Sequence, residues 1–441
     1  MTALYRARVV DTPDNPFTGG ALRAEDDGGL LVVNGTITAR GPFASIRAHS
    51  PAAEVVDLRD GLLIPGLVDT HVHYPQLRAI GGLGLPLLDW LEQCALPEEA
   101  RLADAGYART VAREFTRALA DAGTTSALVF GAHFAPAVDA LFAAARDAGL
   151  RVTAGLVVSD RMLRPELHTT AQRGYDEGRA LAERWHGTGT GRLRYAVTPR
   201  FALSCGDAML EACRALHADV PGSLLTSHIN ENPAEIARVR ELFGGGYLDS
   251  YDRHGLVGKR SVFAHNVHAP DTELDVLAAT GAAVAHCPTS NCALGSGLFA
   301  LDKHVARGVP VALGSDVGAG TGLSLFKEAL QAYFVHQLRD DTREPLTPAH
   351  LLHLATSAGA RALGLDELAG DLSPGKRFDA VWVRPADGTP LGIGLRHAAD
   401  AGAAVSRLFA LATPYDVAAV WVDGELVKAT APPVEAGGTH E

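Results

Sequence analysis

The chain has 441 residues, of which 47% are hydrophobic and 20% are charged. This composition is typical of a folded globular protein and excludes a disordered chain. The 39 basic and 51 acidic residues give a formal charge of −12. A negative surface repels phosphate backbones and anionic lipid, so we expect neither a nucleic-acid partner nor a membrane partner.

Five cysteines are spread over the chain. So few thiols in so long a chain form no disulfide framework, and reduced cysteines are typical of the cytosol. The first residues contain no apolar core of signal-peptide length. No apolar run approaches the ~18–20 residues that cross a bilayer. The sequence therefore predicts a soluble, cytoplasmic protein.

From residue 62 onward, short apolar and β-branched runs alternate with helical stretches. We expect eight strands, at residues 62–69, 124–130, 150–158, 193–197, 223–226, 261–264, 282–285 and 309–313. Stretches between them, such as 104–122 and 134–149, carry apolar residues at three- and four-residue spacing, which indicates helices. Such alternation implies parallel pairing, and eight units predict an α/β fold with a (β/α)₈ TIM-type barrel; a doubly wound open sheet is the alternative.

The two ends of the chain have a different pattern, in which short strand-like runs are separated by Gly and Asp turns. Neither end alone has enough strands for a stable sheet. We therefore predict one small β-sandwich domain built from both chain ends, residues 1–61 and 368–441. The metal-dependent barrel, residues 62–367, is then inserted in it, and residues 432–441 are expected to form a frayed tail.

Histidines and an aspartate stand where five of the predicted strands end. The carboxyl ends of barrel strands form the catalytic rim, because the loops that follow them build the active site. His71 and His73 are two residues apart, which places both imidazoles on one face of a strand. Strands five to eight are followed by His228, His265, His286 and Asp316. Packing alone does not require this pattern, so the sequence predicts a metal centre.

Three neutral imidazoles and one carboxylate suit Zn²⁺ or Fe²⁺, with a position left for a water whose pKa the ion lowers towards ~7. The predicted ligands are His71, His73, His228 and Asp316. His265 is either a further ligand or the group that hydrogen-bonds the water. Two-metal hydrolytic sites often use a bridging lysine on strand four, and the first lysine of this chain is Lys259, after strand five. We therefore expect one ion per chain, unless a carboxylate takes the place of the bridging lysine.

Glu231 lies three residues after His228, past the end of strand five. A loop can turn its carboxylate over the metal-activated water, where it can carry a proton from the water to a ring nitrogen or leaving amine. The alternative to this catalytic role is a structural one, in which Glu231 places a negative charge at the start of the next helix, where acidic residues are favoured.

Three segments, residues 65–73, 227–231 and 314–316, resemble the amidohydrolase superfamily and in particular its mononuclear aminohydrolase branch. Residues 74–76 and 198–204 are similar to the guanine deaminase family. The resemblance extends over roughly residues 62–365 and is weaker in the flanks. It implies a cytoplasmic homodimer that holds one Zn²⁺ per chain, with Fe²⁺ possible, and acts on a small-molecule substrate, guanine.

The residues of these extra segments agree with a purine ligand. Guanine offers two adjacent acceptors, O6 and N7, and the fork of an arginine, here Arg200, matches that pair. Gln76 supplies an amide donor and acceptor to another edge, and Phe201 covers one face of the ring. His286 is expected to assist His265 in orienting the water or the developing charge.

The resemblance implies hydrolytic deamination: water attacks C2, Glu231 protonates the neighbouring ring nitrogen, Asp316 accepts a water proton, and ammonia leaves to give xanthine. A second possibility is an aminohydrolase that acts on another purine, a pyrimidine or a triazine ring. A third is a structural or interaction protein that has kept this scaffold and lost catalysis.

Overall fold

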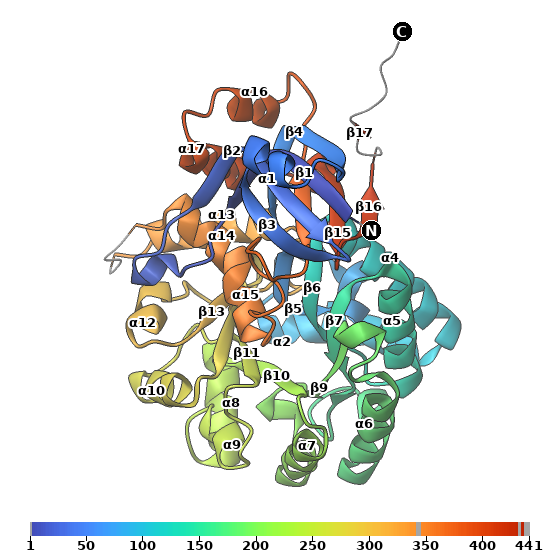
Figure 1. Ribbon diagram of the computed structural model, residues 1–441. Helices are drawn as coiled ribbons and strands as arrows, with labels where there is room; N and C mark the ends of the chain where they lie inside the picture. Colours follow the sequence, from blue (N-terminus) through green and yellow to red (C-terminus); the bar gives the residue numbers. More distant parts are fainter. Residues whose placement is uncertain (1, 341–344, 431–433, 436–441) are drawn as a thin grey trace.

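The computed structural model of the protein describes residues 2–340, 345–430 and 434–435. Its strands form two separate sheets (Figure 1). The larger sheet pairs neighbouring strands in parallel. Its main path runs through β5 (Leu67–His73), β6 (Thr124–Phe130), β7 (Arg151–Gly155), β9 (Leu193–Pro199), β10 (Leu224–Ile229), β11 (Ser261–His265), β12 (Ala283–His286) and β13 (Val311–Leu313). A short strand, β8 (Val157–Val158), pairs with β9.

Hydrogen bonds join the two ends of this sheet. The Asp316 amide donates to the His71 carbonyl at 2.8 Å, and the His73 amide donates to the Val317 carbonyl at 2.9 Å. Thr70 Oγ1 also donates to the Leu313 carbonyl at 2.8 Å. The first and last strands are therefore adjacent, and the prediction of a (β/α)₈ barrel is confirmed.

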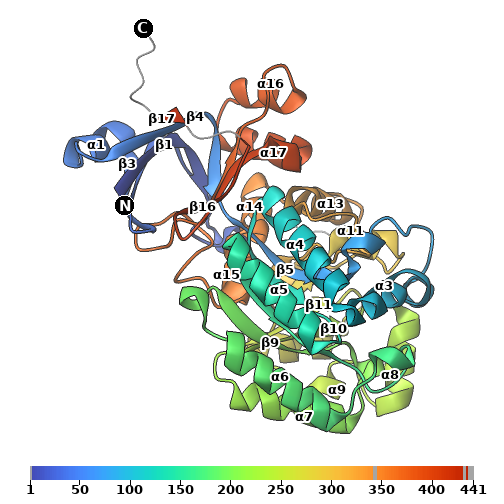
Figure 2. The same cartoon turned by 90° about the vertical axis from the view of Figure 1, so that its right-hand side faces the viewer.

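Helices follow the barrel strands and cover the outside of the sheet, as α4 to α7 do in Figure 2. They are α4 (Ala105–Asp121), α5 (Ala135–Ala148), α6 (Ala171–Trp185), α7 (Asp207–Asp219), α8 (Pro233–Phe243), α9 (Asp249–Asp252), α10 (Asp271–Thr280), α11 (Pro288–Ala293), α12 (Leu301–Ala306), α13 (Leu325–Gln337), α14 (Pro348–Ala355) and α15 (Ser357–Ala362). Short 3₁₀ turns are η2 (Tyr74–Ala79), η4 (Arg101–Ala103), η5 (Pro165–Leu167), η6 (Gly189–Gly191) and η7 (Ala202–Ser204).

Local sequence explains where the two predicted helices begin and end. Asp104 caps α4, because its side chain accepts a hydrogen bond from the Tyr107 amide. Gly149 ends α5 with a φ of +73°, a left-handed conformation that glycine adopts without strain. The predicted ranges 104–122 and 134–149 therefore match α4 and α5.

The smaller sheet combines strands from both ends of the chain. Its order is β16 (Glu425–Ala429), β15 (Val417–Val422), β14 (Ala380–Val383), β4 (Glu54–Pro65), β1 (Thr2–Asp11), β2 (Arg23–Val33) and β3 (Thr36–Pro42), with β17 (Val434–Glu435) paired to β4. The Tyr5 ring stacks on Phe378 with centroids 4.3 Å apart, so the two ends also share a core. The remaining helical segments here are α1 (Phe43–His49), α16 (Pro390–Arg396), α17 (Ala401–Leu411), η1 (Pro16–Thr18) and η8 (Pro414–Asp416).

The strand predicted over residues 62–69 is wrong in its bounds. Residues up to Pro65 belong to β4 of the small sheet, and β5 of the barrel begins at Leu67. The break falls at Gly66, where a Cβ atom would lie 2.1 Å from Thr125 Oγ1. Both strands are buried here, so the sequence is mainly apolar on both sides of Gly66 and does not indicate the break. The domain division at residues 61/62 and 367/368 stays a prediction.

A buried ion pair connects the small sheet to the barrel. Arg151, at the start of β7, donates from Nε to Asp379 Oδ2 at 2.6 Å and also contacts Asp423. The side chains of Arg151 and Asp379 are 4% and 1% exposed. The pair therefore fixes the small sheet against the amino-terminal end of the barrel, away from the catalytic rim.

The five cysteines are unpaired, as predicted. Within the described residues, no helix combines the length and the apolar character that a membrane crossing requires. The predicted tail at 432–441 lies outside the described residues except for 434–435, which pair with β4.

Candidate active site

Two histidines of β5 project from the same face of the strand. β5 is buried along its whole length, and alternate residues of a strand share a face. The Nε2 atoms of His71 and His73 lie 3.1 Å apart. The structure therefore brings together the two imidazoles of the His-x-His motif.

His228, in β10, points to the same place. Its Nδ1 lies 2.5 Å from the Arg200 carbonyl oxygen, and its Nε2 lies 3.2 Å from His73 Nε2. A carbonyl oxygen only accepts hydrogen bonds, so Nδ1 carries the proton and Nε2 directs a lone pair into the cluster.

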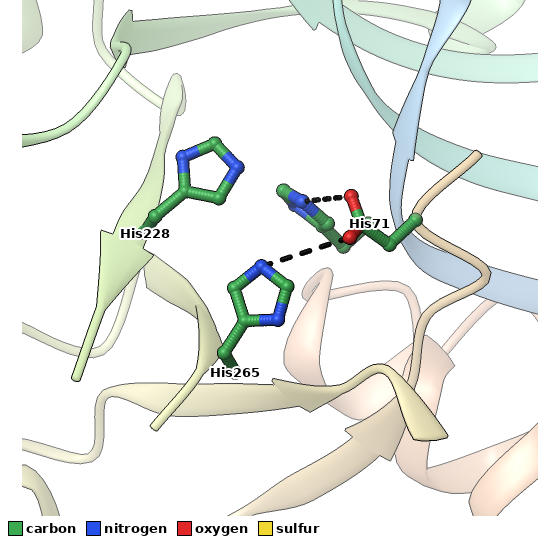
Figure 3. A group of neighbouring side chains, drawn as sticks. His71, His228 and His265 are labelled. Atoms are coloured by element: carbon green, nitrogen blue, oxygen red, sulfur yellow. Dashed lines mark ion pairs between the residues drawn. The ribbon is translucent and has the colours of Figure 1, made fainter. Parts of the chain in front are cut away.

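Asp316 and His265 complete the group. Asp316 Oδ1 lies 3.1 Å from His71 Nε2 and 3.2 Å from His73 Nε2. His265 Nε2 lies 3.8 Å from Asp316 Oδ2, while its Nδ1 faces Asn291 Oδ1 at 3.0 Å. Figure 3 shows the rings of His71, His228 and His265 converging on one point.

These donor atoms fit one divalent ion. One donor atom from each of His71, His228, His265 and Asp316 lies within 4.8 Å of all the others. His73 Nε2 is within 3.2 Å of donor atoms on three of its neighbours. Such separations suit atoms arranged around an ion at about 2.0–2.2 Å, and a nitrogen-rich set with one carboxylate suits Zn²⁺ or Fe²⁺.

Burial prepares the protonation states that a metal ion requires. It lowers the pKa of His71 to about 4 and that of His228 well below its usual value, so both rings are neutral at neutral pH. Burial opposes ionisation of Asp316, but hydrogen bonds from His71 and His73 outweigh it and hold its pKa well below the ordinary range. His71 and His228 therefore offer neutral imidazoles to an ion, and Asp316 offers a carboxylate.

The backbone at the strand ends is held in an uncommon conformation. His265 and Asp316 have φ angles of +72° and +48°, in the left-handed region that side chains other than glycine rarely adopt. Such strain concentrates at functional sites, where the surrounding structure compensates it. Close packing adds a second constraint, because a Cβ atom at Gly314 would lie 2.8 Å from His71 Cβ.

A cavity lies beside the cluster. Its lining comprises His73, Gln76, Leu87, Trp90, Leu91, Arg200, Phe201, His228, Glu231, His265, Leu294, Asp316 and Ala319. Leu87 and Trp90 belong to α2 (Leu87–Trp90), and Leu91 begins the π-helix η3 (Leu91–Ala95). This apolar segment therefore forms part of the cavity lining.

Glu231 follows β10 and lines the cavity. Its Oε2 lies 3.5 Å from His265 Nε2, and its Oε1 accepts a hydrogen bond from Ser296 Oγ at 3.4 Å. Burial, together with the nearby charge of Asp316, raises the pKa of Glu231 to about 8. A carboxyl group with such a pKa can both donate and accept a proton near neutral pH.

Gln76, Arg200 and Phe201 lie together on the cavity wall, and each is at most 4% exposed. Gln76 is in η2, directly after β5, and Arg200 and Phe201 follow β9. The carbon at the centre of the Arg200 guanidinium lies 5.4 Å from the centre of the Phe201 ring.

His286 lies apart from the other predicted substrate contacts. Its ring stacks on Phe299 with centroids 4.2 Å apart, and it is not among the residues that line the cavity. Burial lowers its pKa to about 3, so it is a neutral packed histidine.

Sequence reasoning missed Glu99, which lies in α3 (Leu96–Ala100). One oxygen of Glu99, Oε1, accepts hydrogen bonds from Gln76 Nε2 at 2.7 Å and from Arg200 Nη2 at 2.9 Å. In sequence, Glu99 looks like an ordinary acidic residue in the first turn of a helix, and it is 101 residues from Arg200. No local signal identified it.

Asp69 was also missed as a site residue, although it lies within the β5 motif. Its carboxylate accepts from Ser315 Oγ at 2.5 Å, from the Ser315 amide at 3.0 Å and from the His71 amide at 3.2 Å. It therefore ties the loop that carries Asp316 to the strand that carries the histidines.

Comparisons with known proteins agree with this geometry. The profile of the amidohydrolase family matches residues 62–427. A probable guanine deaminase of Deinococcus radiodurans is 58% identical over 434 residues, which cover 97% of this chain and 98% of that protein. The guanine deaminase of Escherichia coli is 40% identical and covers 95% of both chains. The solved structure of E. coli guanine deaminase matches with a TM-score of 0.91 over 98% of this chain and 100% of that chain, at 37% identity.

Proposed function

Since this chain belongs to the amidohydrolase family, we propose that it catalyses the hydrolytic deamination of guanine to xanthine and ammonia. The observation that carries the proposal is one cavity that is lined both by the metal-binding group and Glu231 and by Gln76 and Arg200. Two relatives that match nearly the full chain are named probable guanine deaminase and guanine deaminase.

The proposed cofactor is one Zn²⁺ per chain, with Fe²⁺ as the alternative, held by His71, His73, His228 and Asp316, and His265 is either a further ligand or the group that hydrogen-bonds the water. When bound, the ion polarises a water molecule and lowers its pKa towards ~7. The nitrogen-rich donor set supports these two metals over Mg²⁺ or Ca²⁺, which prefer oxygen ligands. The residues on strand four, Leu193–Pro199, include no lysine that could bridge a second ion.

Glu231, Asp316 and His265 are the proposed catalytic residues. Glu231 delivers a proton to the ring nitrogen next to C2, which makes C2 more electrophilic, and later helps ammonia to leave. The Asp316 carboxylate, kept ionised by its histidine neighbours, accepts a proton from the water. His265 lies 3.5 Å from Glu231 and 3.8 Å from Asp316, so it can orient the water between them.

Recognition of the purine is assigned to Arg200, Gln76 and Phe201. The free N–H groups of Arg200 match the adjacent acceptors O6 and N7 of guanine, and Gln76 adds a further donor. Phe201 packs against the ring. His286 does not line the cavity, so the proposal gives it no direct contact with the substrate.

Ammonia release is the direct test. The purified protein, with its bound metal quantified, is assayed on guanine, adenine, cytosine, 8-oxoguanine and a triazine. We expect one ion per chain and the highest kcat/KM for guanine. A metal-loaded protein that prefers another ring would overturn the substrate assignment, and one that is inert on all of them would favour a scaffold that has lost catalysis.

A cytoplasmic location and a homodimeric assembly complete the proposal. The five free cysteines support a reducing compartment. Sedimentation analysis of the purified protein tests the dimer, and a monomer at micromolar concentration would refute it.

A further inference from the structure

A buried carboxylate lies behind the two side chains that face the purine in the proposed complex. Glu99 is 4% exposed, and its Oε1 accepts hydrogen bonds from both Gln76 and Arg200. Its Oε2 lies 3.4 Å from His133 Nδ1. A carboxylate has acceptors only, so it fixes which donors of its neighbours are used within the protein.

These hydrogen bonds also determine which N–H groups of Gln76 and Arg200 remain for a ligand. Gln76 Oε1 accepts from the Gly318 amide at 3.0 Å while Gln76 Nε2 donates to Glu99, so the orientation of the amide is fixed from both ends. Arg200 uses Nη2 for Glu99. The remaining N–H groups of both side chains are left for the cavity, which Gln76 and Arg200 line.

Glu99 also cancels a buried positive charge. The titratable groups that face it are Arg200, after β9, and His133, after β6. Burial would raise the pKa of Glu99, but Arg200 and His133 outweigh it and lower that pKa to about 2. Burial lowers the pKa of His133 to about 4, so its ring is neutral near pH 7. The wall formed by Glu99 and Arg200 therefore has no net charge over the neutral range.

Charge neutrality matters because substrate and product differ in acidity. Guanine is uncharged near neutral pH, whereas xanthine begins to lose a proton there and becomes an anion. An arginine without a carboxylate partner in a poorly hydrated pocket would bind the anion tightly. A pocket of this kind would retain its own product.

We propose that Glu99 is a positioning residue with two effects on the proposed guanine site: it orients the free donors of Gln76 and Arg200, and it neutralises Arg200 so that anionic xanthine is released. This inference rests on the proposed function. It adds a determinant of selectivity between the neutral base and the anionic product.

The charge effect is tested with Glu99→Gln, which keeps the size of the side chain and an oxygen that can accept from both neighbours. Xanthine inhibition of guanine turnover is compared at about pH 6 and about pH 9, because one unpaired charge shifts such equilibria by about tenfold or more. At the higher pH we expect the xanthine inhibition constant of the variant to fall about tenfold or more below that of the wild type. At the lower pH the two should agree within about threefold. Glu92→Gln, an exposed position in η3 of the same covering segment, is the control and should match the wild type.

The positioning effect is tested with Glu99→Asp, which keeps the charge and shortens the side chain by one methylene. We expect KM for guanine to rise about tenfold with a smaller change in kcat, and xanthine inhibition to keep the pH dependence of the wild type. Metal content and thermal unfolding are measured for each variant, and xanthine binding is repeated by calorimetry without turnover.

Two results would overturn the inference. If Glu99→Gln changes xanthine affinity equally at both pH values, or not at all, the charge effect is wrong. If Glu99→Asp binds guanine as the wild type does, the positioning effect is wrong. A metal-loaded wild type that does not deaminate guanine would refute the proposed function instead, and the two failures are therefore distinguishable.

Discussion

Replacement of Glu231 by glutamine isolates the proton-transfer step of the proposed mechanism. Glutamine has nearly the same size and still offers an oxygen to Ser296 Oγ, which lies 3.4 Å from the carboxylate. Its amide group, unlike a carboxyl group, neither takes up nor releases a proton near neutral pH. The grouped metal donors come from His71, His228, His265 and Asp316, so the variant should hold as much metal as the wild type.

The expected loss follows from what Glu231 does. General acid–base catalysis contributes roughly 10²–10⁴ in rate. In the proposed mechanism Glu231 both protonates the ring and assists the departure of ammonia. We therefore expect kcat to fall about 10⁴-fold, which corresponds to an activation free energy higher by about 5 kcal/mol. KM should change less than about threefold, because Arg200 and Gln76 hold the ring in this proposal. The assay is steady-state formation of xanthine, with metal per chain determined on the same sample.

Glu235→Gln is the matched control. Glu235 lies in α8, four residues further on; it is fully buried, burial raises its pKa to about 7, and it accepts a hydrogen bond from the Tyr247 hydroxyl. It does not line the cavity. We expect this variant to retain kcat. A metal-loaded Glu231→Gln protein with near-normal kcat would show that another group moves the proton and would refute the assignment.

Three further predictions concern stability and the metal site. Burial raises the pKa of Glu328 from 4.5 to about 8. The protonated carboxyl therefore makes its full contribution to the stability of the folded protein below the unfolded pKa, and this contribution is lost as the pH rises towards 8. The free energy of unfolding changes by about 5 kcal/mol over this pH range, so the urea unfolding of Glu328→Gln should depend less on pH than that of the wild type. The same pH dependence in both proteins would contradict this. Arg151→Met leaves Asp379 buried without its partner and should lower the free energy of unfolding by about 3–5 kcal/mol; unchanged stability would show that the pair contributes little. In Gly314→Ala, the new Cβ would lie 2.8 Å from His71 Cβ. This variant should bind metal about tenfold or more weakly in a chelator competition, and unchanged affinity would mean that the loop relaxes freely.

The barrel could be predicted from the sequence because parallel strands are buried on both faces. Each strand is then a short apolar run between amphipathic helices, and such runs located the barrel strands, the first of them with the wrong bounds. The same property caused the error at residues 62–69. Burial continues across Gly66, and the break is visible only in the backbone partners: the Gly66 amide donates to the Asp379 carbonyl beside the small sheet, whereas the Leu67 amide donates to the Gly123 carbonyl beside the barrel.

The residues around the metal were predictable for a topological reason. Strands in a barrel all point the same way, so side chains at their carboxyl ends must meet at one rim. His71, His73, His228, His265 and Asp316 follow this rule, and the structure brings their donor atoms together. His286 follows the same rule in sequence, but its ring stacks on Phe299 instead. Position at a strand end therefore predicts the rim, while side-chain direction depends on packing that the sequence does not reveal.

Glu99, the proposed positioning residue behind Gln76 and Arg200, obeys no such rule. Glu99 comes from the long connection after β5, whose length and internal structure the barrel does not constrain. This connection also carries Trp90 and Leu91 over the cavity. Four of the five metal-binding side chains lie on strands, and Asp316 closely follows one, whereas Glu99, Trp90 and Leu91 lie in the connection after β5. The connection can therefore change without disturbing the metal. Selectivity for a ring can thus vary within one metal-binding framework, and the segment from Leu87 to Ala100 is where such variation would act in this chain.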